Sequence, residues 1–242
     1  MTEQPPRDDH PTDPLRSPVR PTPPPTPPAP DPAPISTPQP PNPMTRDPAA
    51  ALNLLRSKME TIADEFAQGK INSVQFHMLY RRHSEQRAII EKLLERNPDS
   101  DAWQRVVGTG QTGYLRSHYA AQALYYAVFR VGAERPMQFG GKQTANEPLL
   151  SSMAAKLWAL SNRPNPGLAR KALPSGQWVI IATGEYAGTF VVFSMEPSNA
   201  QARLVRDLHA DFERANAASF QRGQFIAERM VFPQRALAEG SV

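Results

Sequence analysis

The sequence contains no cysteine, which excludes disulfide bonds, thiolate metal sites and a cysteine nucleophile. It also has no apolar run that approaches the roughly 18 residues of a membrane-spanning helix. The first ten residues, MTEQPPRDDH, lack the basic start and the apolar core of a secretion signal. From these absences we expect a cytoplasmic protein without a membrane span.

Large apolar side chains are scarce in the first 46 residues, whereas proline is abundant there. Nineteen of the 27 prolines stand before residue 49. A segment of this composition cannot bury enough surface to offset the entropy lost on ordering. We therefore predict a disordered, proline-rich arm over 1–46, largely in the polyproline-II conformation. The rest of the 242-residue chain is long enough to build a sizeable core.

The sequence also has no long stretch in which charges of one sign are concentrated. The chain has 27 Lys and Arg against 23 Asp and Glu, a net charge of +4. A nucleic-acid-binding domain usually carries a stripe of Lys and Arg. The richest cluster here is the short run Arg81-Arg82-His83, so binding of nucleic acid through a basic surface ranks lowest among our hypotheses.

A helical hairpin is predicted over 47–98. Asp47 and Pro48 are suited to the N-cap and first position of one helix, and Asn72 with Gln75 forms a capping box for the next. The connection of about four residues makes the helices antiparallel. Apolar residues recur in both helices with coiled-coil spacing, and we call them the seam. The seam consists of Leu52, Leu55, Met59, Ile62 and Phe66 in the first helix and Phe76, Leu79, His83, Ile90 and Leu94 in the second.

The turn of this hairpin reads F-x-x-G-x-I-N-x-x-x-F, formed by Phe66, Gly69, Ile71, Asn72 and Phe76. This arrangement resembles the short helix-turn-helix module called SHOCT. The resemblance implies an oligomerisation or attachment element and brings no catalytic residue with it.

Further apolar residues lie beside the seam, namely Leu54, Tyr80, Ile89 and Leu93. Two helices alone leave much of such a surface in water, and an isolated hairpin of this size is rarely stable. The outer edge must therefore be covered by the following domain, by a second copy or by a partner. We predict a second copy, and hence a homodimer.

A glycine-rich linker is predicted over 99–113. Within it, Gly108, Gly110 and Gly113 fit the pattern G-x-G-x-x-G in front of a helix-like stretch. Backbone N–H groups of such a loop can cradle a phosphate group. The segment 103–107 before it is too short and polar for a central parallel strand. These glycines are the candidate binding residues of the alternative hypothesis, a nucleotide- or phosphate-binding protein.

Residues 114–234 predict an α+β domain. Alanines at 120, 121 and 123 favour a helix over 114–131, which we predict, although 124–131 equally fits a buried strand. We predict an edge strand over 136–141, a helix over 146–162 that Asn146 caps, and a strand over 168–173.

Two central strands and a final long helix complete this domain. We predict these strands over Trp178–Thr183 and Phe190–Met195. Their runs Trp178–Ala182 and Phe190–Phe193 are apolar at odd and even positions alike, which is typical of strands covered on both faces. Ser198 and Gln201 form the capping box of the helix that follows. We expect the chain to pack back on the core over 225–232 and to fray from 235 to 242.

The order helix, three strands, helix over 146–220 resembles the second half of the roadblock, longin and profilin-like folds. These folds also need a β-hairpin before the middle helix, which only 124–131 with 136–141 supplies here. The resemblance implies a non-enzymatic platform for dimerisation and docking, commonly for small GTPases. A small GTPase-type partner follows from this analogy alone.

No arrangement of residues indicates a reaction. We identify no pair of metal ligands at helical spacing around the five histidines. Asp207 and Asp211 share a helix face that His209 does not, and His83 lies on the seam, as a core histidine would. Glu185 and Tyr186 occupy a loop tip that could face a partner. We expect no catalytic residue, metal or cofactor, and we infer a non-enzymatic interaction or scaffold protein.

The arm provides the first prediction. Deletion of residues 1–46 leaves the melting temperature nearly unchanged, because the segment has no apolar set to bury. Circular dichroism melting of the full and shortened chains measures this. A drop of several degrees would show that the arm docks on the folded part.

Overall fold

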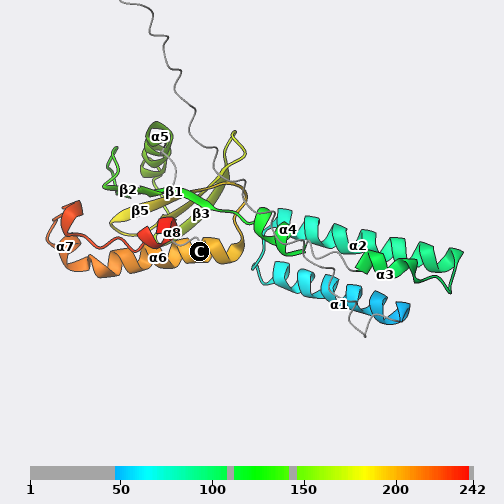
Figure 1. Cartoon of the computed structure of the whole chain (residues 1–242). Coiled ribbons are helices and arrows are strands. Elements are labelled where there is room, and N and C mark those ends of the chain that lie inside the picture. Colours follow the sequence, from blue (N-terminus) through cyan, green and yellow to red (C-terminus); the bar gives the residue numbers. More distant parts are fainter. Residues whose placement is uncertain (1–46, 108–111, 142–145, 240–242) are drawn as a thin grey trace, which may run out of the picture. The chain divides into compact units, whose positions relative to one another are not determined.

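The computed structural model of the chain describes residues 47–107, 112–141 and 146–239. The disordered arm predicted for 1–46 lies outside these residues. Within them the chain forms helices and one five-stranded antiparallel sheet, so the predicted α+β class is confirmed (Figure 1). In the same ranges no helix combines the length and the hydropathy needed to cross a bilayer.

The helical elements come first along the chain. They are α1 (Pro48–Ala67), α2 (Ser73–Arg96), the short 3-10 helix η2 (Asp101–Trp103), α3 (Gln104–Val107) and α4 (Thr112–His118). The sheet and its helices follow. They are β1 (Ala123–Arg130), β2 (Gln138–Gly141), α5 (Glu147–Trp158), β3 (Gly167–Ala172), β4 (Trp178–Thr183), β5 (Ala187–Phe193), α6 (Asn199–Ala215), α7 (Ala217–Gln221), η3 (Ala227–Arg229) and α8 (Arg235–Glu239).

The predicted helix starts are confirmed by their hydrogen bonds. The Asp47 carboxylate accepts the N–H of Ala49 at the start of α1. Both capping boxes are present, one formed by Asn72 with the third residue of α2 and the other by Ser198 with the third residue of α6. The residue after the α1 C-cap, Gly69, has a φ of 71°, a left-handed conformation that glycine adopts without steric cost.

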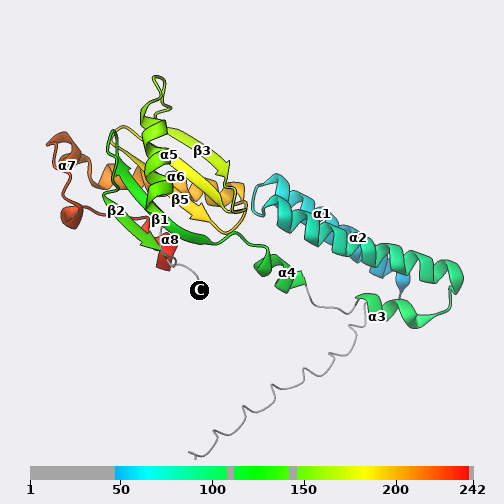
Figure 2. The same cartoon turned by 90° about the horizontal axis from the view of Figure 1, so that it is seen from above.

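The hairpin packs along much of the predicted seam. α1 and α2 lie side by side in both views (Figures 1 and 2). The fully buried seam residues are Leu55, Met59, Ile62, Leu79, His83 and Ile90. Leu52, Phe76 and Leu94 are half-buried, and Phe66 is 40 % exposed. The seam is therefore closed in the middle of the hairpin and open near its turn.

The predicted linker is in part a packed element. Residues 101–107 are helical, and Trp103 is buried against Ala51, Leu55 and Ile90. We call 99–107 and 112–119 the return segment, because it packs along α2 toward the hairpin turn. Gln86 Nε2 donates to the Val106 carbonyl. Further along, Gln75 Nε2 donates to the Arg116 carbonyl. The linker interpretation is therefore wrong for these residues, and they cover one edge of the hairpin.

The helix predicted over 114–131 is wrong beyond His118, and the alternative of a buried strand over 124–131 is the one that the structure shows. The helix α4 ends at His118, and β1 follows as an interior strand of the sheet, whose strand order is β2-β1-β5-β4-β3. Of the eight residues of β1, the six from Leu124 to Phe129 are buried. The alanines give only a weak helical preference, and pairing with strands on both sides outweighs it. The predicted edge strand is confirmed as β2, which pairs with β1.

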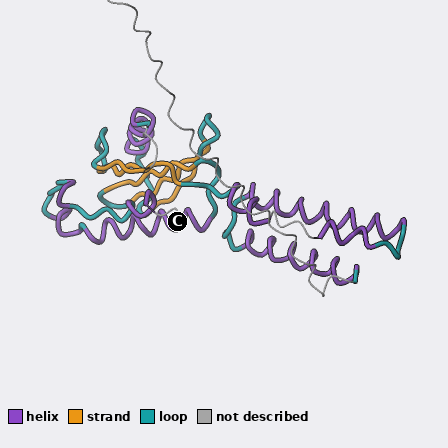
Figure 3. The backbone as a smooth tube through the Cα atoms, viewed as in Figure 1, coloured by secondary structure: helices purple, strands orange, loops and turns teal. Residues whose placement is uncertain are grey.

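The central strands are covered on both faces, as predicted. Figure 3 shows the strands between helices, with α5 on one side and α6 on the other. Alternate side chains divide between two cores. Ile180 and Val191 lie in the core beneath α6, while Val179 and Val192 lie in the core beneath α5. Each core is closed by its own helix, so the hydrophobic effect holds the sheet from two sides.

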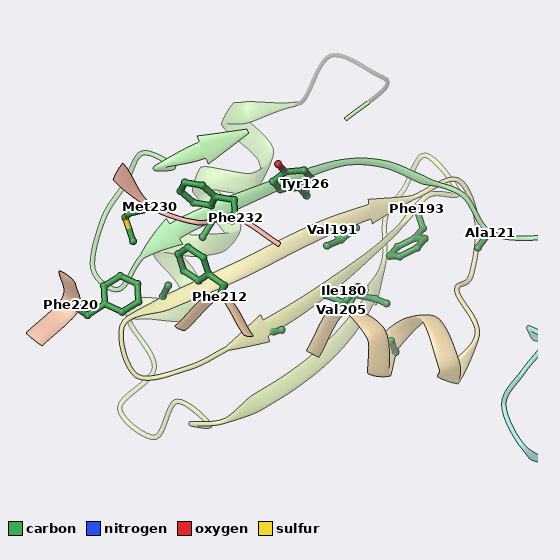
Figure 4. Packing of buried hydrophobic residues seen from close by; sticks show 14 residues of the cluster. Ala121, Tyr126, Ile180, Val191, Phe193, Val205, Phe212, Phe220, Met230 and Phe232 are labelled. Carbon is green, nitrogen blue, oxygen red and sulfur yellow. The ribbon is translucent and has the colours of Figure 1, made fainter. Parts of the chain in front are cut away.

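The C-terminal segment completes the core beneath α6. Phe212 of α6 stacks on Phe232 with ring centroids 5.2 Å apart, and Phe220 and Met230 pack beside them (Figure 4). The chain therefore packs back on the core over 225–232, as predicted. The fraying expected from residue 235 is wrong for 235–239, which form α8 and pack against β1 and β2.

Replacement of Trp103 tests the return segment. Trp103→Ala lowers the free energy of unfolding by about 3–5 kcal/mol, because it empties a site beneath the hairpin helices. Urea denaturation followed by circular dichroism measures the change. The matched control is Tyr114→Ala, since Tyr114 lies in the same segment but is 63 % exposed. Equal effects of the two variants would contradict the packing described here.

Candidate functional site

The edge of the hairpin opposite the return segment carries an open groove. Its volume is about 240 Å³, and we define it by its lining residues, Arg56, Met59, Glu60, Ala63, Tyr80 and Arg87. Met59 forms the apolar floor, because its side chain also closes the seam. Tyr80 is 39 % exposed and stands at the rim. The groove thus exposes apolar surface directly beside the buried seam.

Three aromatic rings extend this surface toward the hairpin turn. Phe66 stacks on Phe76 with ring centroids 4.6 Å apart, and Phe76 contacts Tyr80 at 5.4 Å. None of the three is fully buried. Aromatic side chains contribute large apolar areas at interfaces while the Tyr hydroxyl can remain in water. The row from Met59 to Phe66 is therefore suited to contact another protein surface.

Charges of both signs line the same groove. Arg56 and Arg87 are cationic and Glu60 is anionic, and all three residues line the groove. Arg87 also pairs with Glu91 at 3.2 Å, but both side chains are more than 40 % exposed, so this pair contributes little to stability. A surface with both signs can pair with a copy of itself.

The residues predicted beside the seam divide between the two edges. Leu54 and Ile89 are 42 % and 47 % exposed, whereas Leu93 is half-buried and packs in the cluster around Trp103. Leu54 stands five residues before Met59, which is about 140° around the helix at about 100° per residue. Leu54 therefore does not face the open groove, and neither does Leu93.

Apart from the groove, a cluster of polar groups joins α6 to the turn between β4 and β5. The Glu213 carboxylate accepts backbone N–H groups from Glu185 at 3.1 Å, Tyr186 at 2.8 Å and Ala187 at 3.0 Å. A Cβ atom at Gly184 would fall 2.2 Å from Glu213 Oε2, so a side chain at this position would displace the carboxylate. The carboxylate thus acts as a clamp on the turn.

The tip of this loop, which the sequence suggests as a partner contact, is only partly accessible to a partner. Tyr186 is half-buried and stacks on Phe220 with ring centroids 4.9 Å apart. Glu185 is exposed. Of the two loop residues, only Glu185 is presented fully to solvent.

His209 lies beside the clamp and is buried. Its Nδ1 is 2.9 Å from Thr189 Oγ1, which also accepts a hydrogen bond from Gln234 Nε2 at 3.0 Å. Its Nε2 is 3.8 Å from Glu213 Oε1 and makes no hydrogen bond with the described residues. Burial lowers the pKa of His209, and the nearby Glu213 carboxylate opposes this effect.

The order hydroxyl, imidazole, carboxylate is also that of hydrolytic triads, but this arrangement does not support nucleophilic catalysis. Thr189 is fully buried, so its hydroxyl cannot reach a substrate. A cavity of about 240 Å³ lies beside the cluster and is lined in part by Thr183, Arg206 and His209. His209 and Glu213 supply two ligands, fewer than the three protein ligands of catalytic zinc sites. Among the described residues no group of three metal-ligating side chains occurs.

Sequence reasoning missed Glu213, although it follows His209 by four residues and the pair therefore shares one helix face. No sequence signal pointed to Thr189 or Gln234, because they meet His209 only through the fold. Asp207 and Asp211 are exposed, and each pairs with a neighbouring arginine. His83 is buried with Nδ1 3.0 Å from Gln86 Oε1, as expected for a core histidine.

The structure describes only part of the glycine-rich loop 108–113. Gly108 and Gly110 lie outside the described residues. Gly113 is the second residue of α4, and no atom lies within 4 Å of the position its Cβ would take. Phosphate binding by the 108–113 loop therefore stays a prediction.

Comparison of the chain with protein-family models, with curated proteins and with solved structures finds no match. The resemblances to the SHOCT module and to the roadblock, longin and profilin-like folds therefore stay hypotheses about relationship.

The two buried histidines make stability depend on pH. Burial is the main cause that lowers the pKa of both His83 and His209. The unfolded chain, with histidine pKa values of about 6.5, then binds protons that the folded chain does not. Stability is full above that pH and falls as the pH falls below about 6.5. The melting temperature at pH 7.5 and pH 5.5 measures this decrease.

Substitutions assign the effect to each histidine. His209→Gln and His83→Gln each reduce the difference between the two melting temperatures. His77→Gln is the control, because His77 is exposed. A wild-type chain that is equally stable at both pH values would contradict the prediction.

Proposed function

We propose that this chain is a non-enzymatic interaction protein that forms a homodimer through the open groove of its helical hairpin. The observation that carries the proposal is the row of incompletely buried apolar side chains on one edge, next to a seam that is otherwise closed. The return segment covers the other edge. A surface of this kind gains free energy when a partner removes it from water.

The size of the hairpin is sufficient for a specific interface. α1 has 20 residues and is therefore about 30 Å long. Two helices of about 10 Å diameter present a face of roughly 600 Å² in projection, and side-chain relief increases the accessible area. A standard interface buries about 800 Å² on each partner. The hairpin face that carries the groove is therefore comparable in size with one half of a standard interface.

Charge complementarity favours a second copy as the occupant. In a two-fold interface the same patch faces itself, so each groove meets the charges that it carries. Glu60 of one protomer can then pair with Arg56 or Arg87 of its partner. A self-facing patch of one sign would repel, whereas this mixed patch does not.

The α+β domain is the second interaction surface in this proposal. β1 pairs with β2 directly before α5, which supplies the β-hairpin that the roadblock and longin-like resemblance requires. This element order supports a docking role, and a small GTPase-type partner rests on the analogy alone.

Mass measurements on matched variants test the dimer. Sedimentation equilibrium gives the wild type twice the chain mass of 26.8 kDa. Tyr80→Arg in the groove shifts the mass toward the single chain, because it places an unpaired charge in the interface. Leu54→Arg is the control, since Leu54 has nearly the same exposure but lies away from the groove.

The melting temperature of both variants checks that the hairpin remains folded. A wild type that sediments as a single chain at tens of micromolar would overturn the proposal. Equal dissociation by Leu54→Arg would place the interface elsewhere.

A further inference from the structure

The strand β3 is an edge of the sheet that the described residues leave uncovered. The opposite edge, β2, has only four residues and packs against α8. β3 has six residues, and all of them after Gly167 are exposed. It pairs with β4 in continuous register without a bulge. An edge of this length is a template on which an extended chain can add a strand.

The backbone register shows which groups point outward. Leu173 donates its N–H to the Gln177 carbonyl, which continues the ladder between β3 and β4. Because hydrogen-bonded and open pairs alternate in an antiparallel ladder, Leu168, Arg170 and Ala172 direct their N–H and C=O groups away from β4. Within the described part of the chain these outward groups have no hydrogen-bond partner. They can pair with one added strand.

The side chains of this edge are basic on both faces of the sheet. Arg170 lies on the α6 side, where its guanidinium donates to Asn199 Oδ1 at the start of α6. Lys171 follows on the opposite side and is exposed. The nearest cross-strand neighbours on β4 are the apolar Ile180 and Val179. No carboxylate on β3 or β4 offsets the two positive charges.

We propose that β3 is the docking edge for an extended acidic segment of a partner protein, which adds to the sheet as a sixth strand. Two neighbouring acidic residues of that segment stand opposite Arg170 and Lys171, one on each face. Opposite charges in such cross-strand positions stabilise pairing. This inference rests on the proposed role of the α+β domain in docking, and it names the surface and the chemistry of the partner.

A second copy fits this edge less well than an acidic segment. The antiparallel register that pairs 168–172 with the same residues of another chain sets Arg170 opposite Arg170. Like charges directly opposite destabilise a strand pair. The dimer proposed above therefore uses the hairpin, and the sheet edge stays free for a different chain.

Peptide titration of the full-length protein tests the site. The probe is acetyl-Val-Thr-Glu-Glu-Val-Thr-amide, and the comparison peptide has Lys-Lys in place of Glu-Glu. We expect the acidic peptide to shift the backbone amide signals of Leu168, Arg170 and Ala172 in a two-dimensional NMR spectrum. The basic peptide leaves them in place. If neither peptide moves these signals, or if both move them equally, the proposal is overturned.

Charge reversal gives a second and independent readout. Lys171→Glu weakens binding of the acidic peptide about tenfold, and Arg170→Glu combined with Lys171→Glu transfers the preference to the basic peptide. The matched control is Lys92→Glu combined with Arg96→Glu, an equal change of charge at exposed positions of α2. An equal loss in the control would show attraction by net charge and contradict the docking edge.

The sedimentation mass, measured on the same samples, separates this inference from the proposed dimer. A dimer that binds no acidic peptide overturns the docking edge alone. Peptide binding by a protein with the mass of one chain overturns the hairpin dimer alone.

Discussion

Burial of the central strands on both faces is the constraint on which the rest of the α+β domain depends. Val191 and Val192 follow each other in β5, yet they lie in different cores. Each face must therefore be closed by its own helix, and the chain supplies α5 before β3 and α6 after β5. Full burial of one such side chain contributes about 1.5–3 kcal/mol. Removal of either helix would expose a whole row of these residues.

The same requirement to cover apolar surface explains the hairpin and its open edge. The return segment places Trp103 against α1 and α2 on one side and thereby closes that side. It has no counterpart over the groove at Met59 and Tyr80 among the described residues. This asymmetry is the basis of the proposed dimer, in which the open edge of each chain is covered by the other chain.

The polar centre at Glu213 is best understood as part of the architecture. Its carboxylate accepts three N–H groups of a tight turn. The Thr189 hydroxyl, to which Gln234 donates, lies 2.9 Å from Nδ1 of the buried His209. Buried polar groups usually need such partners, since an unsatisfied one costs about 1–3 kcal/mol. The geometry fixes the β4–β5 turn on α6.

Elements whose signals are local could be predicted from the order of residues alone. Caps such as Asp47 and Ser198 mark helix starts, and the unbroken apolar runs of β4 and β5 indicate strands with two covered faces, because these patterns arise from neighbours along the chain. The strand at 123–130 could not be predicted in this way, because pairing with neighbouring strands overrides a weak helical preference there. The packing of Trp103 and the meeting of His209, Glu213 and Thr189 were likewise decided by the fold. Such contacts join residues far apart in sequence, and no local pattern records them.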